Sequence, residues 1–286
     1  MRVAPDWTEY SVIATGDGEK LERWGNLVLL RPDPQIIWHA VKPLRSYKGI
    51  DAIYERSSTG GGRWVFNREG VKTEFILHWR DLAFSLKLMG FKHTGLFPEQ
   101  AANWDRMMKL IEGANRKVSV LNLFGYTGAA SVACKRAGAD VCHVDGAKAM
   151  VERAGENIRL SGLDSDGMRY IIDDCFKFCK RELKRGKRYD AIILDPPSFG
   201  RGPNGEKWKI EEGISELVEL VAKLLSDKPL FVCLNSYTTG LQPAVMSNVL
   251  RLALPKNAKI DADEIGIATE EGLILPQGCT AFAEFE

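Results

Sequence analysis

The order of apolar and polar positions divides the chain into two stretches that change character near residue 90. Before that point, short apolar runs separated by turn residues predict β-strands in hairpins or a small mixed sheet. These predicted strands are Leu27–Leu30, Ala52–Tyr54, Arg63–Phe66 and Lys72–His78, with glycine or proline clusters at 16–18, 32–34 and 60–62 between them. The pattern predicts a β-rich module over residues 1–90 and a larger domain over residues 91–286.

In the second stretch, short apolar runs alternate with helical patterns. The predicted strands are Val118–Leu123, Val141–Val144, Met168–Ile172, Ala191–Leu194 and Leu230–Leu234, and the helices between and after them cover about 129–137, 147–160, 175–184, 211–225 and 244–254. Such alternation predicts a parallel sheet covered by helices on both faces. Two further strands, 259–267 and 279–285, lack an intervening helix and predict a closing antiparallel hairpin. The expected fold is α/β, with a mostly parallel, seven-stranded, Rossmann-like sheet.

Composition places the chain among ordinary globular proteins. Its 286 residues are 45% hydrophobic and 27% charged, which excludes disordered, collagen-like and coiled-coil chains. The net charge of +1 neither demands nor forbids a nucleic-acid partner. No stretch approaches the roughly 20 apolar residues of a membrane helix, and the first ten residues lack the apolar region of a secretory signal. We therefore expect no membrane association.

Cysteine usage indicates a reducing, cytoplasmic environment. The six cysteines are Cys134, Cys142, Cys175, Cys179, Cys233 and Cys279. Most lie in apolar segments and form no dense framework, so buried thiols are the expectation. Cys175 and Cys179 could share a helix face, but the four histidines show no paired spacing that would complete a metal site. We expect no metal.

Glycines and carboxylates follow the first three predicted strands of the large sheet, where ligands of open α/β sheets bind. Gly125 and Gly128 allow a tight turn and close approach to a ligand just before a helix. Their spacing is not Gly-x-Gly-x-x-Gly, which argues against a dinucleotide. Asp145 ends the second strand, where a carboxylate can accept hydrogen bonds from ribose hydroxyls. Asp173-Asp174 ends the third and could accept from an adenine amino group, with helix capping as the alternative for these aspartates.

The fourth predicted strand ends in a sharper motif, Asp195-Pro196-Pro197-Ser198-Phe199. Two prolines have fixed φ and lack N–H donors, so they hold a rigid loop where a ligand would lie. Rigid carbonyls and a neighbouring aromatic ring can grip a flat, flipped base and accept hydrogen bonds from an exocyclic amine. A structural Pro-Pro turn is the alternative.

Together, these strand ends resemble the class I S-adenosyl-L-methionine-dependent methyltransferases. The segment from Thr94 to Asn103 resembles the one that precedes the core in bacterial large-subunit rRNA cytosine-5 and guanine-N7 methyltransferases. The resemblance implies catalytic roles for Asp195, Pro196, Pro197 and Phe199. It implies cofactor-binding roles for Phe97, Gln100, Asn103, Asn122, Phe124, Gly125, Thr127, Gly128, Asp145, Gly146, Asp173, Asp174 and Asp195. Near Phe97, a helix start at Pro98-Glu99 is the structural alternative.

The chain departs from the cytosine-5 relatives at the end of the fifth strand. Those enzymes carry a Ser-Cys-Ser-like turn whose thiolate attacks the base, whereas Ser236 stands at the aligned position here. Cys233 lies inside the strand, where burial makes a thiol inert. A serine without a nearby base is a poor nucleophile. We therefore expect direct transfer, with Asn235 and Ser236 orienting the substrate by hydrogen bonds.

Two features bear on an RNA partner. A basic run follows the third strand and could contact phosphates or form a solvated helix face; it comprises Lys177, Lys180, Arg181, Lys184, Arg185, Lys187 and Arg188. Arg201, Lys207 and Lys209 flank the glycine-rich stretch 200–205 after the Asp-Pro-Pro motif and are better placed for a phosphate contact. The five tryptophans of the first 80 residues could stack on bases, although a compact aromatic core is the favoured interpretation.

The sequence therefore predicts a cytoplasmic methyltransferase that uses S-adenosyl-L-methionine on RNA, with rRNA as the expected substrate and residues 1–90 as its substrate-recognition module. The same chemistry on a protein or small molecule is one alternative, and a non-catalytic nucleotide- or RNA-binding protein on the same scaffold is another. The oligomeric state, a homodimer included, is left open.

Overall fold

The computed structural model describes residues 1–57, 61–88, 90, 93–201 and 207–285, and the chain divides into two compact units. The larger unit comprises Met1–Arg2, Asn103–Ile265 and Gly278–Glu286, and the smaller comprises Val3–Ala102 and Gly266–Gln277. The smaller unit thus includes a C-terminal segment that the sequence analysis assigned to the larger domain. The expected domain boundary after residue 90 stays a prediction.

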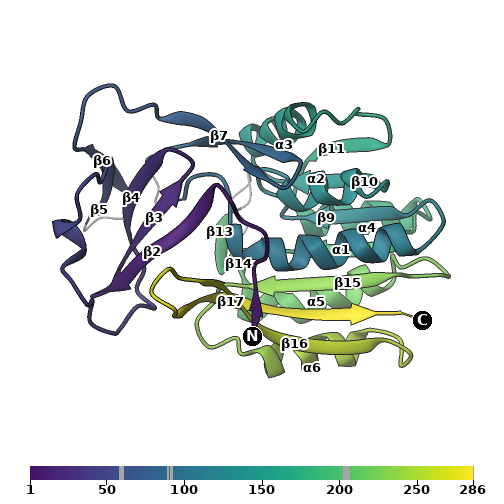
Figure 1. The fold of residues 1–286 in the computed structure, drawn as a ribbon. Coiled ribbons are helices and arrows are strands. Elements are labelled where there is room, and N and C mark those ends of the chain that lie inside the picture. Colours follow the sequence, from purple (N-terminus) through teal and green to yellow (C-terminus); the bar gives the residue numbers. More distant parts are fainter. Residues whose placement is uncertain (58–60, 89, 91–92, 202–206, 286) are drawn as a thin grey trace. The chain divides into compact units, whose positions relative to one another are not determined.

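The larger unit is built on the predicted, mostly parallel sheet (Figure 1). Its strand order is β1-β16-β17-β15-β12-β9-β10-β11. The strand bounds are β1 (Arg2–Val3), β9 (Ser119–Leu123), β10 (Asp140–Asp145), β11 (Met168–Ile172), β12 (Ala191–Leu194), β15 (Phe231–Ser236), β16 (Lys259–Ala268) and β17 (Ile274–Glu284). Strands β15, β12, β9, β10 and β11 pair in parallel, and β17 runs antiparallel to β15. The predicted sheet is confirmed, with the two-residue β1 as an unpredicted eighth strand.

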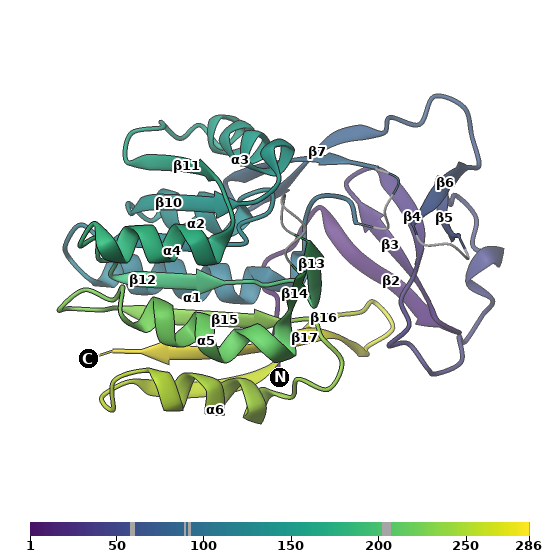
Figure 2. The same cartoon turned by 180° about the vertical axis from the view of Figure 1, so that it is seen from behind.

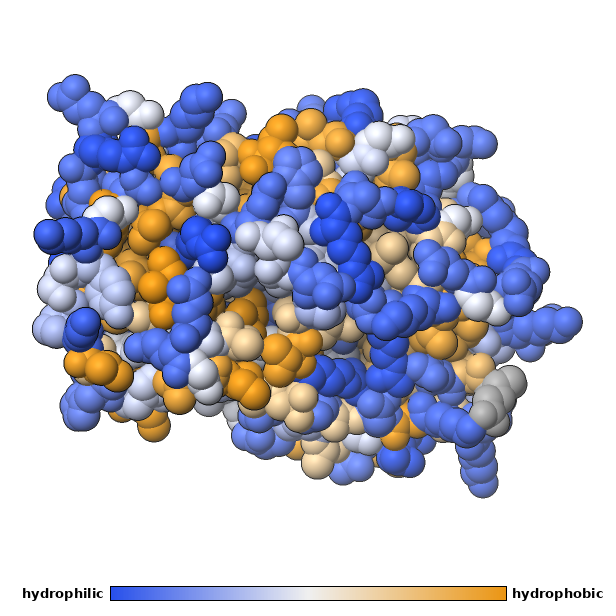
Figure 3. Space-filling model, viewed as in Figure 1, coloured by the Kyte–Doolittle hydropathy of each residue, from blue (hydrophilic) through white to orange (hydrophobic). Residues whose placement is uncertain are grey.

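Helices cover both faces of this sheet, because its strands are apolar on both sides. The α-helices of the described residues are α1 (Ala101–Gly113), α2 (Ala129–Arg136), α3 (Lys148–Leu160), α4 (Cys175–Lys184), α5 (Ile210–Ala222) and α6 (Pro243–Ala253). Helices α1 to α3 lie on one face and α4 to α6 on the other (Figures 1 and 2). One core packs Val120, Val141 and Ile193 against α1 and α2, and the other packs Leu121, Val144 and Ile192 against α4, α5 and α6. Hydrophilic side chains, interspersed with small apolar patches, cover the outer side of α1 to α3 (Figure 3).

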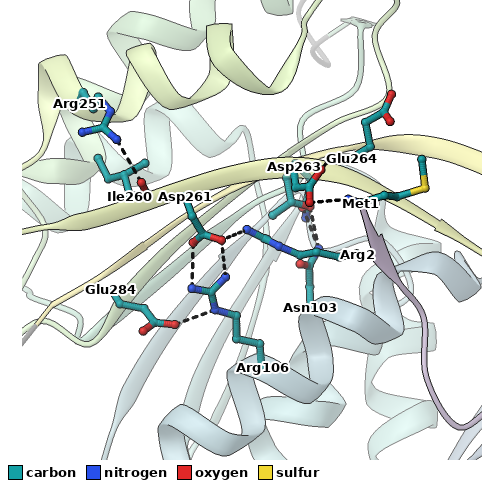
Figure 4. A network of polar contacts seen from close by, with 12 residues as sticks. Met1, Arg2, Asn103, Arg106, Arg251, Ile260, Asp261, Asp263, Glu264 and Glu284 are labelled. Carbon is teal, nitrogen blue, oxygen red and sulfur yellow. Dashed lines mark hydrogen bonds and ion pairs between the residues drawn. The ribbon is translucent and has the colours of Figure 1, made fainter.

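Helix α1 was not among the predicted helices, although its apolar positions follow a helical repeat. Trp104, Met107, Met108 and Ile111 are all buried, at the spacing of one helix face. On its polar side, Arg106 donates to Asp261 and Glu284 at 2.7–3.1 Å (Figure 4). The guanidinium of Arg106 also lies over the ring of Phe282. This network ties α1 to β16 and β17. Among the described residues, no helix combines the length and the apolar character needed to cross a bilayer.

The smaller unit contains a five-stranded sheet, β2-β3-β4-β5-β6, and a separate hairpin, β7-β8. The bounds are β2 (Tyr10–Gly16), β3 (Glu19–Trp24), β4 (Leu27–Pro32), β5 (Ala52–Arg56), β6 (Gly62–Phe66), β7 (Glu74–Trp79) and β8 (Leu82–Lys87), with short 3-10 helices η1 (Leu44–Ser46) and η2 (Pro98–Gln100). Trp24 and Trp79 are fully buried, and Trp7 packs against Trp79 and Tyr10. The aromatic residues therefore contribute to a core, as the favoured interpretation predicted.

A buried ion-pair network also stabilises the smaller unit. Glu22, which is fully buried, accepts two hydrogen bonds from Arg31 and one from the hydroxyl of Tyr10. Burial alone would raise the pKa of Glu22, but the charges of Arg31 and Lys20 outweigh it and lower that pKa. Lys20 also lies 3.1 Å from the carboxylate of Asp33. Each buried charge in this set thus has an opposite partner.

Candidate functional site

Four adjacent strands end at one edge of the large sheet, and backbone hydrogen bonds continue from each strand end to the next. The amide of Gly125, after β9, donates to Val144 of β10 at 3.0 Å, and the amide of Asp173, after β11, donates to Asp145 at 3.1 Å. On the other side of β9, the amide of Asp195, after β12, donates to Leu123 at 3.4 Å. The acidic residues predicted from separate motifs therefore lie along one continuous edge.

Asp145 presents an oriented carboxylate at this edge. One oxygen accepts from the amide of Tyr126 at 2.9 Å and the other from the amide of Ala147 at 2.8 Å. The N-cap of α3 is Ala147, which makes no side-chain capping bond, so Asp145 is not the cap of that helix. Each carboxylate oxygen can accept a further hydrogen bond. A half-buried acid held in this way is suited to receive two hydroxyl donors.

The loop between β9 and α2 is shaped by close packing beneath it. Phe124 and Tyr126 adopt positive φ values of 55° and 50°, and Gly128 has φ 84°. A Cβ at Gly125 would lie 2.3 Å from the ring of His143, and one at Gly128 would lie 2.6 Å from the Cβ of Ala154. The glycines are therefore required by the packing under the loop, which is a reason that the sequence analysis did not foresee.

A chain of buried polar side chains lies under the same loop. Asn122 donates to the hydroxyl of Ser131 at 2.9 Å, and that hydroxyl lies 3.0 Å from Nδ1 of His143. Burial lowers the pKa of His143 to about 4, so the ring is neutral near pH 7. The side chain of Asn122 is 2% exposed, which gives it a supporting position under the loop. Its predicted cofactor-binding role, and that of Thr127, which is equally buried, stay predictions.

The two aspartates after β11 have different partners. Asp174 is the N-cap of α4, and its carboxylate accepts from the amide of Lys177 at 2.8 Å. Asp173 accepts from the amide of Asp174 at 2.8 Å and forms an ion pair with Arg181. Capping, the alternative considered for this pair, is thus realised at Asp174. Gly146, directly after Asp145, is exposed and has room for a Cβ, whose nearest neighbour would be the carbonyl of Asp173 at 3.9 Å.

The segment Asp195–Phe199 leaves β12, beside the end of β9, at this edge. Pro196 is buried and Pro197 is exposed, and the side chain of Phe199 is 51% exposed. The hydroxyl of Ser198 accepts a hydrogen bond of 2.6 Å from Thr238, which follows β15. The loop is therefore held from the neighbouring strand while an aromatic ring faces solvent.

Comparison with known proteins agrees with this geometry. A family model described as S-adenosylmethionine-dependent methyltransferase matches residues 55–250, more than half of the chain. This chain belongs to that family. The resemblance inferred from its strand ends is therefore confirmed, and S-adenosylmethionine is the cofactor of the family.

Individual relatives carry related names. A crystal structure of a SAM-dependent methyltransferase from Agrobacterium tumefaciens is 33% identical, with a TM-score of 0.92 over 98% of this chain and 91% of that one. A putative ribosomal RNA large subunit methyltransferase of Methanocaldococcus jannaschii is 34% identical over 68% of this chain and 50% of its own. The ribosomal RNA large subunit methyltransferase K/L of Shewanella frigidimarina is 32% identical over 54% and 21%. This chain therefore spans half or less of the length of these two curated relatives.

A tryptophan that the sequence analysis did not assign to the site lies beside the Asp-Pro-Pro loop. Trp208, in β14 (Lys207–Lys209), donates from Nε1 to the carbonyl of Pro197 at 2.6 Å. Its ring also lies 5.7 Å from that of Phe124. The signal available in the sequence was an indole eleven residues beyond Pro197, with Gly213 following on the next helix.

The end of β15 is occupied by a buried polar cluster. Asn235 is 2% exposed, and its side-chain oxygen accepts from Asn103 at 3.1 Å and from Thr280 at 2.7 Å. Ser236 is also buried, and its hydroxyl accepts from the amide of Thr238. The proposed orientation of substrate by Asn235 and Ser236, and the cofactor role of Asn103, stay predictions, and this geometry favours an indirect contribution from all three.

The remaining predicted residues are distributed over other parts of the chain. Phe97 and Gln100 belong to the smaller unit, where Gln100 is buried at the end of η2, and their cofactor roles stay predictions. Residues 202–205 of the glycine-rich stretch, and the side chain of Arg201, lie outside the described part of the chain. Lys209 forms an ion pair with Glu212 at 2.7 Å. In the described ranges, no three His, Cys, Asp or Glu side chains converge as metal ligands would.

The basic run follows α4 from the carboxyl edge of the sheet toward the opposite edge, where β12 begins. Arg181 pairs with Asp173, and Arg185 pairs with the buried Glu182. Lys184, Lys187 and Arg188 are exposed at the far end of the helix. These last three cations therefore lie away from the candidate site, which favours the solvated helix face over a phosphate contact beside the reacting base.

Proposed function

We propose that this chain is an RNA methyltransferase that binds S-adenosylmethionine at the carboxyl edge of its large sheet and methylates a base of large-subunit rRNA. The observation that carries the proposal is the continuous edge formed by Gly125, Asp145, Asp173 and Asp195. All six cysteines are free and buried, which supports a reducing, cytoplasmic location.

The residues at this edge suit the cofactor. When bound, the cofactor supplies an activated methyl group on a positively charged sulfur. The Asp145 carboxylate, already oriented by the amides of Tyr126 and Ala147, would accept the two ribose hydroxyls. Asp173 and Asp174 would receive the adenine edge, and the backbone around Phe124 to Gly128 would form the floor. The buried Asn122 would support that floor from below through Ser131 and His143.

The residues of the Asp195–Phe199 loop suit a flat nucleophile. The carboxylate of Asp195 and the carbonyl of Pro196 would hold an amine or ring nitrogen, and the exposed ring of Phe199 would stack on the base. Alignment of the attacking nitrogen is the main contribution expected from these residues, because the methyl donor is already reactive. The names of the curated relatives support rRNA as the substrate class, and the smaller unit, which contains most of residues 1–90, would serve in substrate recognition.

Transfer is proposed to proceed without a cysteine nucleophile. Cys233 is fully buried, and this burial raises the pKa of its thiol far above the ordinary value. A thiol that stays protonated inside a strand cannot attack a base. The other cysteines of the described chain are likewise buried.

Replacement of Cys233 provides a direct test of this mechanism. We expect Cys233→Ala to keep turnover within about twofold of the wild type, because the thiol takes no part in the reaction. The initial rate of methyl transfer to RNA is the measurement. A covalent protein–RNA adduct on a denaturing gel that disappears in Cys233→Ala would refute direct transfer.

The substrate class is tested by incubating the protein with methyl-labelled S-adenosylmethionine and large-subunit RNA transcribed in vitro. We expect label in one RNA fragment after nuclease digestion. Label on protein, on a small molecule or on nothing would contradict the RNA assignment.

A further inference from the structure

We propose that Trp208 is a positioning residue that holds the Asp195–Phe199 loop against the Phe124–Gly128 loop and thereby couples the cofactor site to the substrate site. The kinetic effect expected from this coupling rests on the proposed function. The contacts that support it are independent of the identity of the substrate.

The first contact fixes the loop itself. The indole Nε1–H of Trp208 donates to the carbonyl of Pro197 at 2.6 Å. Strand pairing also holds Trp208 next to the loop, because Trp208 lies opposite Gly200 in the hairpin of β13 (Phe199–Arg201) and β14. Since Pro197 lacks an N–H of its own, its carbonyl is the group through which the backbone at this residue can be held.

The second contact fixes the indole. A Cβ at Gly213, in the first turns of α5, would lie 2.6 Å from Cζ3 of Trp208, so the ring lies directly on the backbone of that helix. Helix α5 is part of the large core, with Ile210, Ile214 and Leu217 buried. A glycine at this position of a helix lowers helix propensity, which is explained by the space that the indole needs.

The third contact reaches the cofactor loop. The rings of Trp208 and Phe124 lie 5.7 Å apart at an interplanar angle of 39°, within the range of favourable aromatic pairs. Phe124 has a positive φ, and its amide donates to the sulfur of Cys175 at 3.4 Å. A movement of Phe124 on cofactor binding would therefore be felt at the indole and, through its N–H, at Pro197.

Two further hydrogen bonds, both to Ser198, complete the restraint on the loop. Thr238 donates to the hydroxyl of Ser198, and the amide of Ile210 donates to the Ser198 carbonyl at 3.1 Å. Pro197 and Ser198 are thus held by different elements. The half-exposed ring of Phe199 is consequently displayed from a loop of defined shape.

The kinetic test compares Trp208→Phe, which keeps a ring but removes the N–H, with Trp208→Ala, which removes both. Because Trp208→Phe removes one hydrogen bond, we expect it to lower kcat for methylation of large-subunit RNA by about 3- to 10-fold. Its affinity for S-adenosylhomocysteine should stay within about twofold of wild type. Trp208→Ala is expected to weaken that affinity as well. Trp64→Phe, in β6 of the smaller unit, is the matched control and should leave the affinity for S-adenosylhomocysteine unchanged.

A spectroscopic test separates positioning from activity. In a ¹⁵N-labelled protein, the indole N–H signal of Trp208 is identified by its loss in Trp208→Phe. We expect this proton to exchange slowly with solvent and its signal to shift when S-adenosylhomocysteine is added. A rapidly exchanging proton, an unmoved signal, or a Trp208→Phe variant with wild-type kcat and KM would each overturn the proposal. Absence of methyl transfer by the wild type would instead refute the RNA function, and the indole signal would still decide the role of Trp208.

Discussion

At the residue scale, the cofactor loop depends on a glycine whose role is steric. Gly125→Ala would place a methyl group 2.3 Å from the buried ring of His143. Overpacking of this kind costs about 1–3 kcal/mol. We therefore expect urea denaturation to show a free energy of unfolding that is lower by this amount. Gly146→Ala, one strand away, meets its nearest atom at 3.9 Å and should leave stability unchanged. Equal stabilities for the two variants would contradict this packing.

The ring beneath that glycine predicts a pH dependence. Burial lowers the pKa of His143 to about 4 from an ordinary 6.5, so the folded protein binds this proton less readily than the unfolded chain. Its neutral form therefore contributes fully above pH 6.5, and stability falls as pH drops toward 4, by about 2–3 kcal/mol at pH 4.5. Urea unfolding at pH 7 and pH 4.5 measures this decrease in the free energy of unfolding. The His143→Gln variant should lack the part of the decrease that comes from His143. An identical pH profile in His143→Gln would show that the ring is already solvated.

At the element scale, Asp174, the N-cap of helix α4, has two candidate roles. Asp174 caps the helix through the amide of Lys177, so Asp174→Ala should lose about 1 kcal/mol of stability. Asp174→Ser restores a capping oxygen and should recover that loss in thermal unfolding. If Asp174 also receives the adenine edge, Asp174→Ser will remain weak in binding S-adenosylhomocysteine. Full recovery of both properties would leave only the capping role.

The strands and helices of the large sheet were largely predictable, whereas α1, β1, the β13–β14 hairpin and the smaller unit's β2, β3 and β8 were not predicted. Strands β9 to β12 were predicted within a residue or two, because continuous apolar runs must lie inside a covered sheet. Helix α1 was not predicted although Trp104, Met107, Met108 and Ile111 repeat at helical spacing; the Thr94–Asn103 motif, on which the expectation for this segment rested, includes only its first three residues. Strand β1 has two residues, too few for any periodic pattern to exist.

At the scale of the whole molecule, the sequence located the edge of the site better than the direction of its side chains. Asp145 and Asp195 follow buried strands, and parallel pairing with β9 forces both to one edge. Asn122 and Asn235 follow the same rule, yet each is 2% exposed and hydrogen-bonds within the protein. Whether an amide faces a ligand or a neighbouring strand depends on packing across elements. The same holds for Trp208, whose ring partner Phe124 lies far away in the chain.

Titration calorimetry with S-adenosylhomocysteine tests most directly the proposal that the cofactor binds where these strand ends meet. We expect one equivalent to bind the wild type and Asp145→Ala to bind about 10- to 100-fold more weakly, because a charge-assisted hydrogen-bond acceptor is lost. Asp227→Ala, an exposed acid before the start of β15, is the matched control and should bind like the wild type. No binding to the wild type, or equal affinity in Asp145→Ala, would contradict cofactor binding at this edge of the sheet.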